Sequence, residues 1–226
     1  LIVTVLVLGL AACATPEPVG LGSIDPVASP TPIEDSATAD PESVPIAPTG
    51  ELEALVTGLR APWSIVPLPT GSVFLSERDT ARILELSPQG ALSVVGTVPG
   101  VVPGGEGGLL GLAALDTGTP YLYAYLTGST DNRIVRMPVT GTPGAYALGD
   151  AEVVLAGIPK ARTHNGGRLA FGPDGMLYAT TGDAQQTGLA QDPASLAGKI
   201  LRLTPDGTVP ADNPVPGSYV YSLGHR

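Results

Sequence analysis

The stretch that decides the fold is THNGGRLAFGPDGMLY, residues 163–178. It predicts a β-hairpin, because an apolar run over Arg168–Phe171 leads into the turn sequence Pro173-Asp174-Gly175. Proline presets φ in such a turn, and glycine tolerates the positive φ that the turn requires. The next residues, Met176–Thr181, have the composition of a second strand.

Two ionisable residues flank this hairpin. His164 lies in the polar, glycine-rich loop before the first strand, and Asp183 follows the second strand. The two strands run in opposite directions, so we expect both residues at the same edge. Histidine has an unperturbed pKa near neutrality, which makes His164 a candidate proton acceptor with Asp183 as its orienting partner. The alternatives are a structural loop histidine and an aspartate that caps the turn after its strand.

The composition predicts an all-β protein. Of 226 residues, 30 are glycine and 24 proline, only 14% are charged, and short apolar runs alternate with turn residues. The net charge is −10, and residues 1–50 hold six acids and no Lys or Arg. The remainder holds 15 acids and 11 bases without a basic patch, so we expect no nucleic-acid binding.

The first 13 residues are predicted to be a lipoprotein signal segment. Residues 1–12 (LIVTVLVLGLAA) are too few to span a bilayer, but they are typical of the apolar part of a signal peptide. Cys13 is the single cysteine, so it forms no intramolecular disulfide. Its place after Leu10-Ala11-Ala12 resembles the bacterial lipobox, which predicts lipidation of Cys13 and an extracytoplasmic, membrane-anchored protein. A buried strand that ends in an inert cysteine is the alternative.

Residues 14–50 are predicted to be a disordered linker. They contain eight prolines and six acids, with no aromatic and no basic residue, and they cannot bury a core. We interpret them as a solvated tether rather than as a binding segment for a basic partner. The folded part is then residues 51–226.

The folded part contains three similar units. Each has an apolar strand, a turn that ends in glycine, a second strand, and a third strand whose first residue is basic. The turn glycines are Gly71, Gly118 and Gly175, and the basic residues are Arg82, Arg133 and Lys199. Units of four short strands, repeated every 40–50 residues or so, indicate β-propeller blades.

Two further expectations follow from these units. The third unit has a longer loop, 182–198, which we place on the functional face. Residues 219–223 look like the opening of a fourth blade, so the chain would carry about three and a half blades. Since a propeller needs a closed ring, we expect the chain to be part of a longer protein.

The motifs, taken in order from about residue 55 to the end of the chain, resemble those of the soluble quinoprotein glucose and aldose-sugar dehydrogenases, also called the glucose/sorbosone dehydrogenase family. Each motif is a short run of turn, glycine-rich or strand-opening residues. They are Ala61-Pro62-Trp63, Ser76-Glu77-Arg78, Gly105–Gly111, His164–Leu169, Phe171–Gly175, Gly182-Asp183, Gly198–Arg202, Asp212-Asn213-Pro214 and Gly224-His225-Arg226.

This resemblance implies a six-bladed β-propeller that binds pyrroloquinoline quinone (PQQ) and calcium. It also implies oxidation of an aldose at its anomeric carbon to a lactone, with an external electron acceptor. By the same resemblance, His164 is the general base, Asp183 orients it, and Arg226 and Glu106 lie at the cofactor and substrate pocket. The family's later sequence supplies most of the cations around PQQ and the calcium ligands, so we expect the chain as given to be inactive.

Two other functions remain open at this point. A non-catalytic propeller lipoprotein could bind a sugar or a protein partner, and clustered Lys and Arg on the pocket face of the remaining blades would argue against it. A six-bladed hydrolase, such as a lactonase, would need metal-binding carboxylates and asparagines at the central channel. The sequence shows no such cluster in these blades.

Overall fold

The computed structural model describes residues 50–115 and 120–226, and Leu52–Arg226 forms one compact unit. The predicted signal segment, the lipidation site Cys13 and the predicted linker up to residue 49 lie outside the described residues. The turn glycine Gly118 of the second unit lies outside them as well.

The first sheet is a four-stranded antiparallel meander. Its strands are β1 (Pro62–Pro67), β2 (Val73–Glu77), β3 (Arg82–Leu86) and β4 (Leu92–Thr97), and they lie in chain order. Gly71 lies between β1 and β2, and Arg82 is the first residue of β3, as the first repeat unit predicts.

The second sheet has five strands. They are β5 (Leu109–Leu115), β6 (Tyr121–Thr127), β7 (Asn132–Thr140), β8 (Ala147–Leu148) and β9 (Glu152–Ile158). The long strand β7 pairs with β9 along its first half and with β8 along its second half. Strand β9 and the two-residue strand β8 therefore share the place of one outer strand.

The third sheet contains the hairpin on which the sequence prediction centred. Its strands are β10 (Gly166–Phe171), β11 (Leu177–Thr181), β12 (Lys199–Leu203) and β13 (Val220–Leu223), again in chain order. The loop between β11 and β12 holds the short helix α1 (Thr187–Gln191).

The interpretation of residues 219–223 as the start of a fourth blade was wrong. Strand β13 pairs with β12, with Val220 opposite Leu201 and Ser222 opposite Ile200, so it is the outer strand of the third sheet. The Tyr221 ring packs edge-on against Tyr178, with ring centroids 5.4 Å apart. The described residues thus form three sheets, each with its outer position filled.

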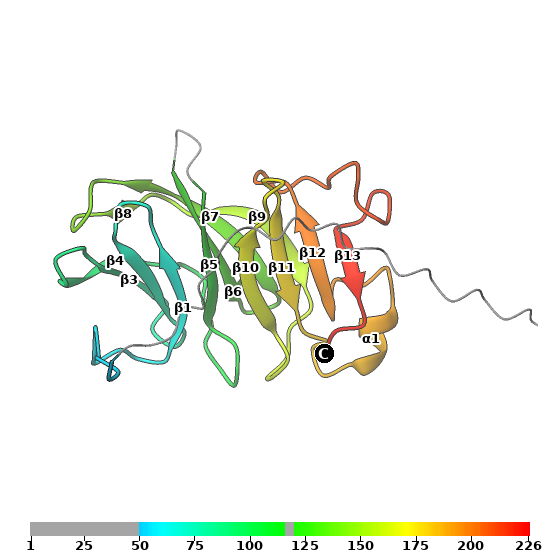
Figure 1. Ribbon diagram of the computed structural model, residues 1–226. Coiled ribbons are helices and arrows are strands. Elements are labelled where there is room, and N and C mark those ends of the chain that lie inside the picture. The colour runs from blue at the N-terminus through cyan, green and yellow to red at the C-terminus, as the bar shows by residue number, and fades with distance from the viewer. Residues whose placement is uncertain (1–49, 116–119) are drawn as a thin grey trace, which may run out of the picture. The chain divides into compact units, whose positions relative to one another are not determined.

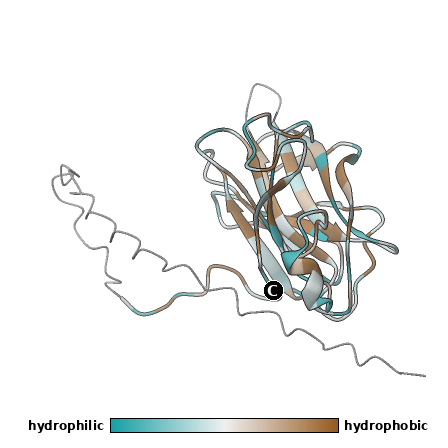
Figure 2. Cartoon of the chain, turned by 90° about the vertical axis from the view of Figure 1, so that its right-hand side faces the viewer, coloured by the Kyte–Doolittle hydropathy of each residue, from teal (hydrophilic) through white to brown (hydrophobic). Residues whose placement is uncertain are grey.

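The three sheets follow one another as blades of a β-propeller, which confirms the predicted fold class. Figure 1 shows them side by side in chain order, and the innermost strands β1, β5 and β10 are neighbours. Two apolar cores join the blades: one lies between the first and second sheets and one between the second and third. Figure 2 shows hydrophobic residues along the strands. Burial of this apolar surface is the main force that holds blade to blade.

Buried serines join the first two blades by hydrogen bonds. Strand β5 has an irregular register between Leu109 and Leu112, which leaves backbone groups of β5 without ladder partners. Ser64 Oγ accepts a hydrogen bond from Leu112 N at 3.1 Å, and Ser76 Oγ donates to Leu110 O at 2.7 Å. Ser76 Oγ also accepts from Ser64 N at 3.0 Å. The serines therefore satisfy the buried irregularity of the neighbouring blade.

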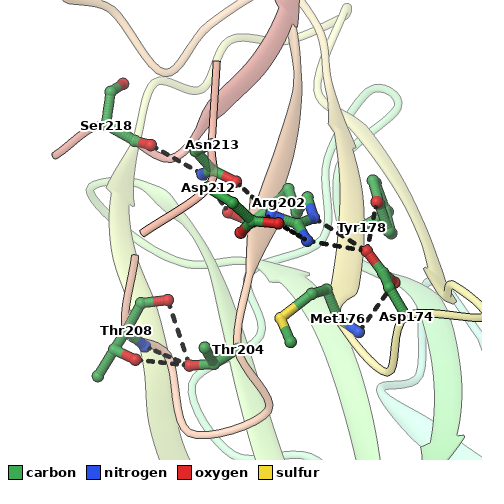
Figure 3. A network of polar contacts seen from close by, with 9 residues as sticks. All are labelled: Asp174, Met176, Tyr178, Arg202, Thr204, Thr208, Asp212, Asn213 and Ser218. Atoms are coloured by element: carbon green, nitrogen blue, oxygen red, sulfur yellow. Dashed lines mark hydrogen bonds and ion pairs between the residues drawn. The ribbon is translucent and has the colours of Figure 1, made fainter. Parts of the chain in front are cut away.

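An arginine holds the outer end of the third blade together (Figure 3). The Arg202 side chain is buried and donates to Asp174 Oδ2 at 3.0 Å, Asp212 Oδ1 at 2.8 Å and Asn213 Oδ1 at 2.9 Å. The Asp212 and Asp174 carboxylates raise the pKa of Arg202, so the guanidinium stays charged. The contact ties the β10–β11 turn to the loop that leads into β13, and it gives Asp174 and Arg202 structural roles.

Replacing Ser76 by alanine in the complete protein should destabilise it by about 1–3 kcal/mol, because Ser64 N and Leu110 O would lose a buried partner. Urea unfolding would measure the free energy of unfolding. Ser93→Ala, at an exposed position of β4, is the matched control and should change it by no more than about 0.5 kcal/mol. Equal effects of the two substitutions would contradict the blade-joining role of Ser76.

Candidate active site

The β10–β11 hairpin brings His164 and Asp183 together, as the sequence pattern predicts. His164 precedes β10 and Asp183 follows β11, and the pairing of Gly166 with Thr181 places both at the same edge of the sheet. His164 Nδ1 lies 2.8 Å from Asp183 Oδ1. The Asp183 side chain is 3% exposed and that of His164 is 20% exposed. The carboxylate is therefore buried behind an imidazole that solvent can still reach.

Asp183 is held as an anion. The hydrogen bond with His164, together with one from Gln185 N at 2.9 Å and the nearby charge of Arg226, lowers the pKa of Asp183 although burial opposes this. An ionised carboxylate only accepts hydrogen bonds, so neutral His164 carries its proton on Nδ1. Its Nε2 then has a free lone pair, and Nε2 makes no hydrogen bond to any residue in the described part of the chain. The pair is arranged to take up a proton at Nε2.

The backbone at His164 adopts a left-handed conformation, with φ +60°. Non-glycine residues seldom adopt this region, and they keep it only where their surroundings enforce it. Glu106 Oε2 accepts a hydrogen bond from His164 N at 2.7 Å, and Ala184 N donates to His164 O at 3.2 Å. Both backbone groups of the histidine are thus held from outside its own loop.

A buried polar network supports the next residue, Asn165. Its side chain exchanges hydrogen bonds with the backbone of Ala161 and accepts one from Asn132 Nδ2 at 3.0 Å. Tyr125 OH donates to the Asn165 carbonyl oxygen at 2.9 Å. Burial raises the pKa of Tyr125, so this hydroxyl remains a donor. The sequence pattern did not predict this network. The available signal was the polar run from Thr127 to Asn132, in which no apolar residue occurs.

Lys199 is a second residue whose role the sequence analysis missed. Its side chain is fully buried, and Nζ donates to the carbonyl oxygens of Leu189 (2.7 Å), Ala190 (3.1 Å) and Ala197 (2.6 Å). Burial lowers the pKa of Lys199. The ammonium ties α1 and the end of loop 182–198 to the start of β12, and so it fixes the loop that contains Asp183.

An open pocket of about 330 Å³ lies in front of His164. Glu106, Lys199 and Arg226 line it together with Thr180, Thr181 and His225. Asp183 lines an adjoining hollow with His164 and Arg226. The structure therefore brings four predicted site residues, His164, Asp183, Glu106 and Arg226, to one place.

Of the described cations that line the pocket, Arg226 is the one available to a cofactor, because the Lys199 ammonium is bound to three carbonyl oxygens. The Arg226 guanidinium makes no hydrogen bond to a described residue, whereas His225 Nε2 is already engaged with Ser222 Oγ at 2.7 Å. Within the described ranges there is no group of three or more His, Cys, Asp or Glu side chains that could hold a metal ion. No helix in residues 50–115 or 120–226 has the length and apolar character needed to cross a lipid bilayer.

Comparison with known proteins gives consistent results. The sequence profile of the glucose/sorbosone dehydrogenase family matches residues 59–226. Quinoprotein glucose dehydrogenase B from Acinetobacter calcoaceticus is 31% identical, over 77% of this chain and 44% of that protein. An aldose sugar dehydrogenase from Escherichia coli is 31% identical, over 74% of this chain and 47% of that protein.

The solved structures point the same way. The PQQ-bound form of aldose sugar dehydrogenase from Streptomyces coelicolor is 51% identical and superposes with a TM-score of 0.73, over 77% of this chain and 54% of that one. The chain thus spans about half the length of the relatives it matches.

Substitution of Asp183 by asparagine should remove a pH-dependent part of the stability. The folded-state pKa of Asp183 is lowered, so its contribution is fully present above the unfolded pKa of about 3.9 and is lost as the pH falls below that value. Urea unfolding at pH 5, 4 and 3 should show the stability advantage of the wild type over Asp183→Asn shrinking as the pH falls. An advantage that stays constant over this range would contradict an ionised Asp183.

Replacement of Lys199 by methionine should cost about 3 kcal/mol or more, because three carbonyl oxygens lose their partner. Thermal or urea unfolding measures this loss, and limited proteolysis should show faster cleavage within 182–198. Lys160→Met is the matched control, since Lys160 Nζ bonds one carbonyl oxygen, that of Gly128, and should cost about 1 kcal/mol. Equal stability of the two variants would contradict the role of Lys199 in holding loop 182–198 in place.

Proposed function

Because this chain belongs to the PQQ-dependent glucose/sorbosone dehydrogenase family, we propose that it forms part of an enzyme that oxidises aldose sugars to lactones. The observation that carries the proposal is the 2.8 Å contact between His164 Nδ1 and the buried carboxylate of Asp183, beside an open pocket. A base with an oriented, free nitrogen is what removal of a hydroxyl proton requires.

In the proposed reaction, His164 acts on the hydroxyl group at the anomeric carbon of the sugar. Nε2 takes the hydroxyl proton while the electron pair of the C1–H bond leaves as hydride, and the C1–O bond becomes a carbonyl. Asp183 keeps Nδ1 protonated and stabilises the positive charge that forms on the imidazole. The buried position of Asp183 strengthens this interaction, because less water screens it.

PQQ, when bound, supplies the acceptor for the hydride. It is an acidic quinone, and the donor set of this pocket suits an anion: the Arg226 guanidinium has no hydrogen-bond partner among the described residues, and it faces the same space as His164. Arg226 would hold a carboxylate of the cofactor, as guanidinium groups commonly do. Glu106 also lines this pocket.

The proposal includes calcium and an external electron acceptor as partners of the complete enzyme. It assigns no calcium ligand to the described residues, because these offer no suitable cluster of carboxylates or histidines. The proposed substrate class is an aldose sugar.

We also propose that the protein is lipid-anchored through Cys13 and works outside the cytoplasm. The support is the apolar run that ends at the single cysteine, followed by a proline-rich, acidic stretch. Mass spectrometry of the protein from its native membrane would test this: a diacylglyceryl group on Cys13 is expected, and an unmodified Cys13 in the mature protein would overturn it.

A dye-reduction assay tests the enzymatic proposal. The complete protein without its lipid anchor would be supplied with PQQ, calcium and a panel of aldoses. Dye reduction that requires both PQQ and sugar is expected. If the protein neither reduces the dye nor takes up PQQ, as followed by its absorbance, it is a binding propeller and the proposal fails.

Substitution of His164 by alanine in the complete protein should lower the rate of sugar oxidation by about 100-fold or more, because the proton acceptor is lost. PQQ uptake should stay close to that of the wild type, since Arg226 is unchanged. Steady-state kinetics and PQQ titration measure the two effects separately. Unchanged activity in His164→Ala would rule out its role as the base.

A further inference from the structure

Glu106 makes an unusual contact with the proposed base. It does not touch the imidazole; its Oε2 accepts a hydrogen bond from the backbone N–H of His164 at 2.7 Å. A hydrogen bond to an ionised acceptor is stronger than one between neutral groups. Glu106 thus acts on the main chain of the residue whose side chain faces the pocket.

The turn that carries Glu106 is fixed against the same loop. Glu106 N donates to Arg162 O at 2.8 Å, and Gly104 and Gly107 close the turn through two backbone hydrogen bonds. A Cβ at Gly105 would lie only 2.1 Å from Arg162 O, so this turn packs directly on the backbone two residues before the histidine. Glu106 therefore binds this loop at two points: its backbone N–H donates to Arg162 O, and its side chain accepts from His164 N.

The Glu106 carboxylate also lies near the positive charge of Arg78. Asp79, and to a smaller extent Glu106, raise the pKa of Arg78, so Glu106 stands in the field of a nearby guanidinium. Glu106 Oε1 makes no hydrogen bond to a described residue. Glu106 is also one of the residues that line the pocket.

The backbone conformation of His164 requires contacts of this kind to hold it. With φ +60°, His164 occupies a backbone region that an unconstrained histidine would leave. Its carbonyl oxygen is held by Ala184 N, which belongs to the loop that carries Asp183. Its N–H is held by Glu106, which lies in the connection between β4 and β5. Loss of either contact frees the loop to relax towards an ordinary conformation, and this would turn Nε2 away.

We propose that Glu106 is a positioning residue, which clamps the backbone of His164 in its left-handed conformation and so aims Nε2 into the pocket. This inference rests on the proposed function for its kinetic consequence, but the clamp itself is a property of the protein alone. It differs from the expectation that Glu106 simply contacts the cofactor or the sugar.

The test compares Glu106→Gln with Glu106→Ala in the complete protein. Glutamine keeps an acceptor oxygen for the His164 N–H, whereas alanine removes it. Hydrogen–deuterium exchange of the peptide covering 160–166, measured without cofactor or sugar, reads the clamp directly. Alanine should speed this exchange by about tenfold, and glutamine should leave it near the wild-type rate. Glu152→Ala, at an exposed carboxylate of β9 that pairs with Arg136, should change nothing.

Steady-state kinetics of the complete enzyme with PQQ bound provide the second measurement. In Glu106→Ala, kcat should fall by about 100-fold with little change in KM, because a base displaced by about 1 Å still leaves the sugar bound. Glu106→Gln should restore kcat to within about threefold of the wild type. Unfolding temperatures of all variants would separate this effect from general destabilisation.

Two results would overturn the proposal. One is unchanged exchange at 160–166 in Glu106→Ala together with a raised KM, which would make Glu106 a direct ligand contact. The other is a glutamine variant that is as impaired as the alanine variant, which would make its charge the essential property. If the wild type itself oxidises no aldose, the proposed function fails, and the exchange measurement alone decides whether the clamp exists.

Discussion

The structure depends on one constraint: backbone N–H and C=O groups that are buried where blades and loops meet must find hydrogen-bond partners. In this chain side chains supply them. Ser64 and Ser76 satisfy the irregular part of β5, and Tyr125 satisfies the carbonyl group beside the proposed base. Lys199 satisfies three carbonyl groups of loop 182–198. Glu106 makes the same kind of contact at a more exposed position, with the N–H of His164. The same kind of contact that joins the blades also shapes the site.

The fold could be predicted from the sequence wherever information is local. Turn residues such as Pro173-Asp174-Gly175 mark hairpins by their own φ preferences, so three repeated units and an all-β class were within reach. The assignment of 219–223 failed because nothing in this short run indicates whether it pairs with the preceding strand β12 or begins a new sheet. A short apolar run has the same composition whether it is the last strand of one sheet or the first strand of the next. Here it pairs with the otherwise unpaired edge of β12.

The site divides in the same way. The approach of His164 to Asp183 follows from hairpin geometry, and the sequence contains everything needed to expect it. Lys199 was noticed only as the first residue of a strand, because no local pattern says that its ammonium will turn back to three carbonyl groups of the preceding loop. Asn132 and Tyr125 were missed for a related reason: they come from the second blade, and their partners lie more than 30 residues away.

These different sequence separations have a consequence for how the site assembles. His164 and Asp183 are 19 residues apart and belong to one hairpin, so their contact forms in a local step with a small loss of chain entropy. Glu106 and His164 are 58 residues apart, and Glu106 lies in the connection between β4 and β5, so this contact forms only when that connection packs against the loop before β10. The nascent third blade would therefore carry a complete His–Asp pair on a backbone that is still free to relax. Packing of the β4–β5 connection against the third blade is then the folding event that orients this pair.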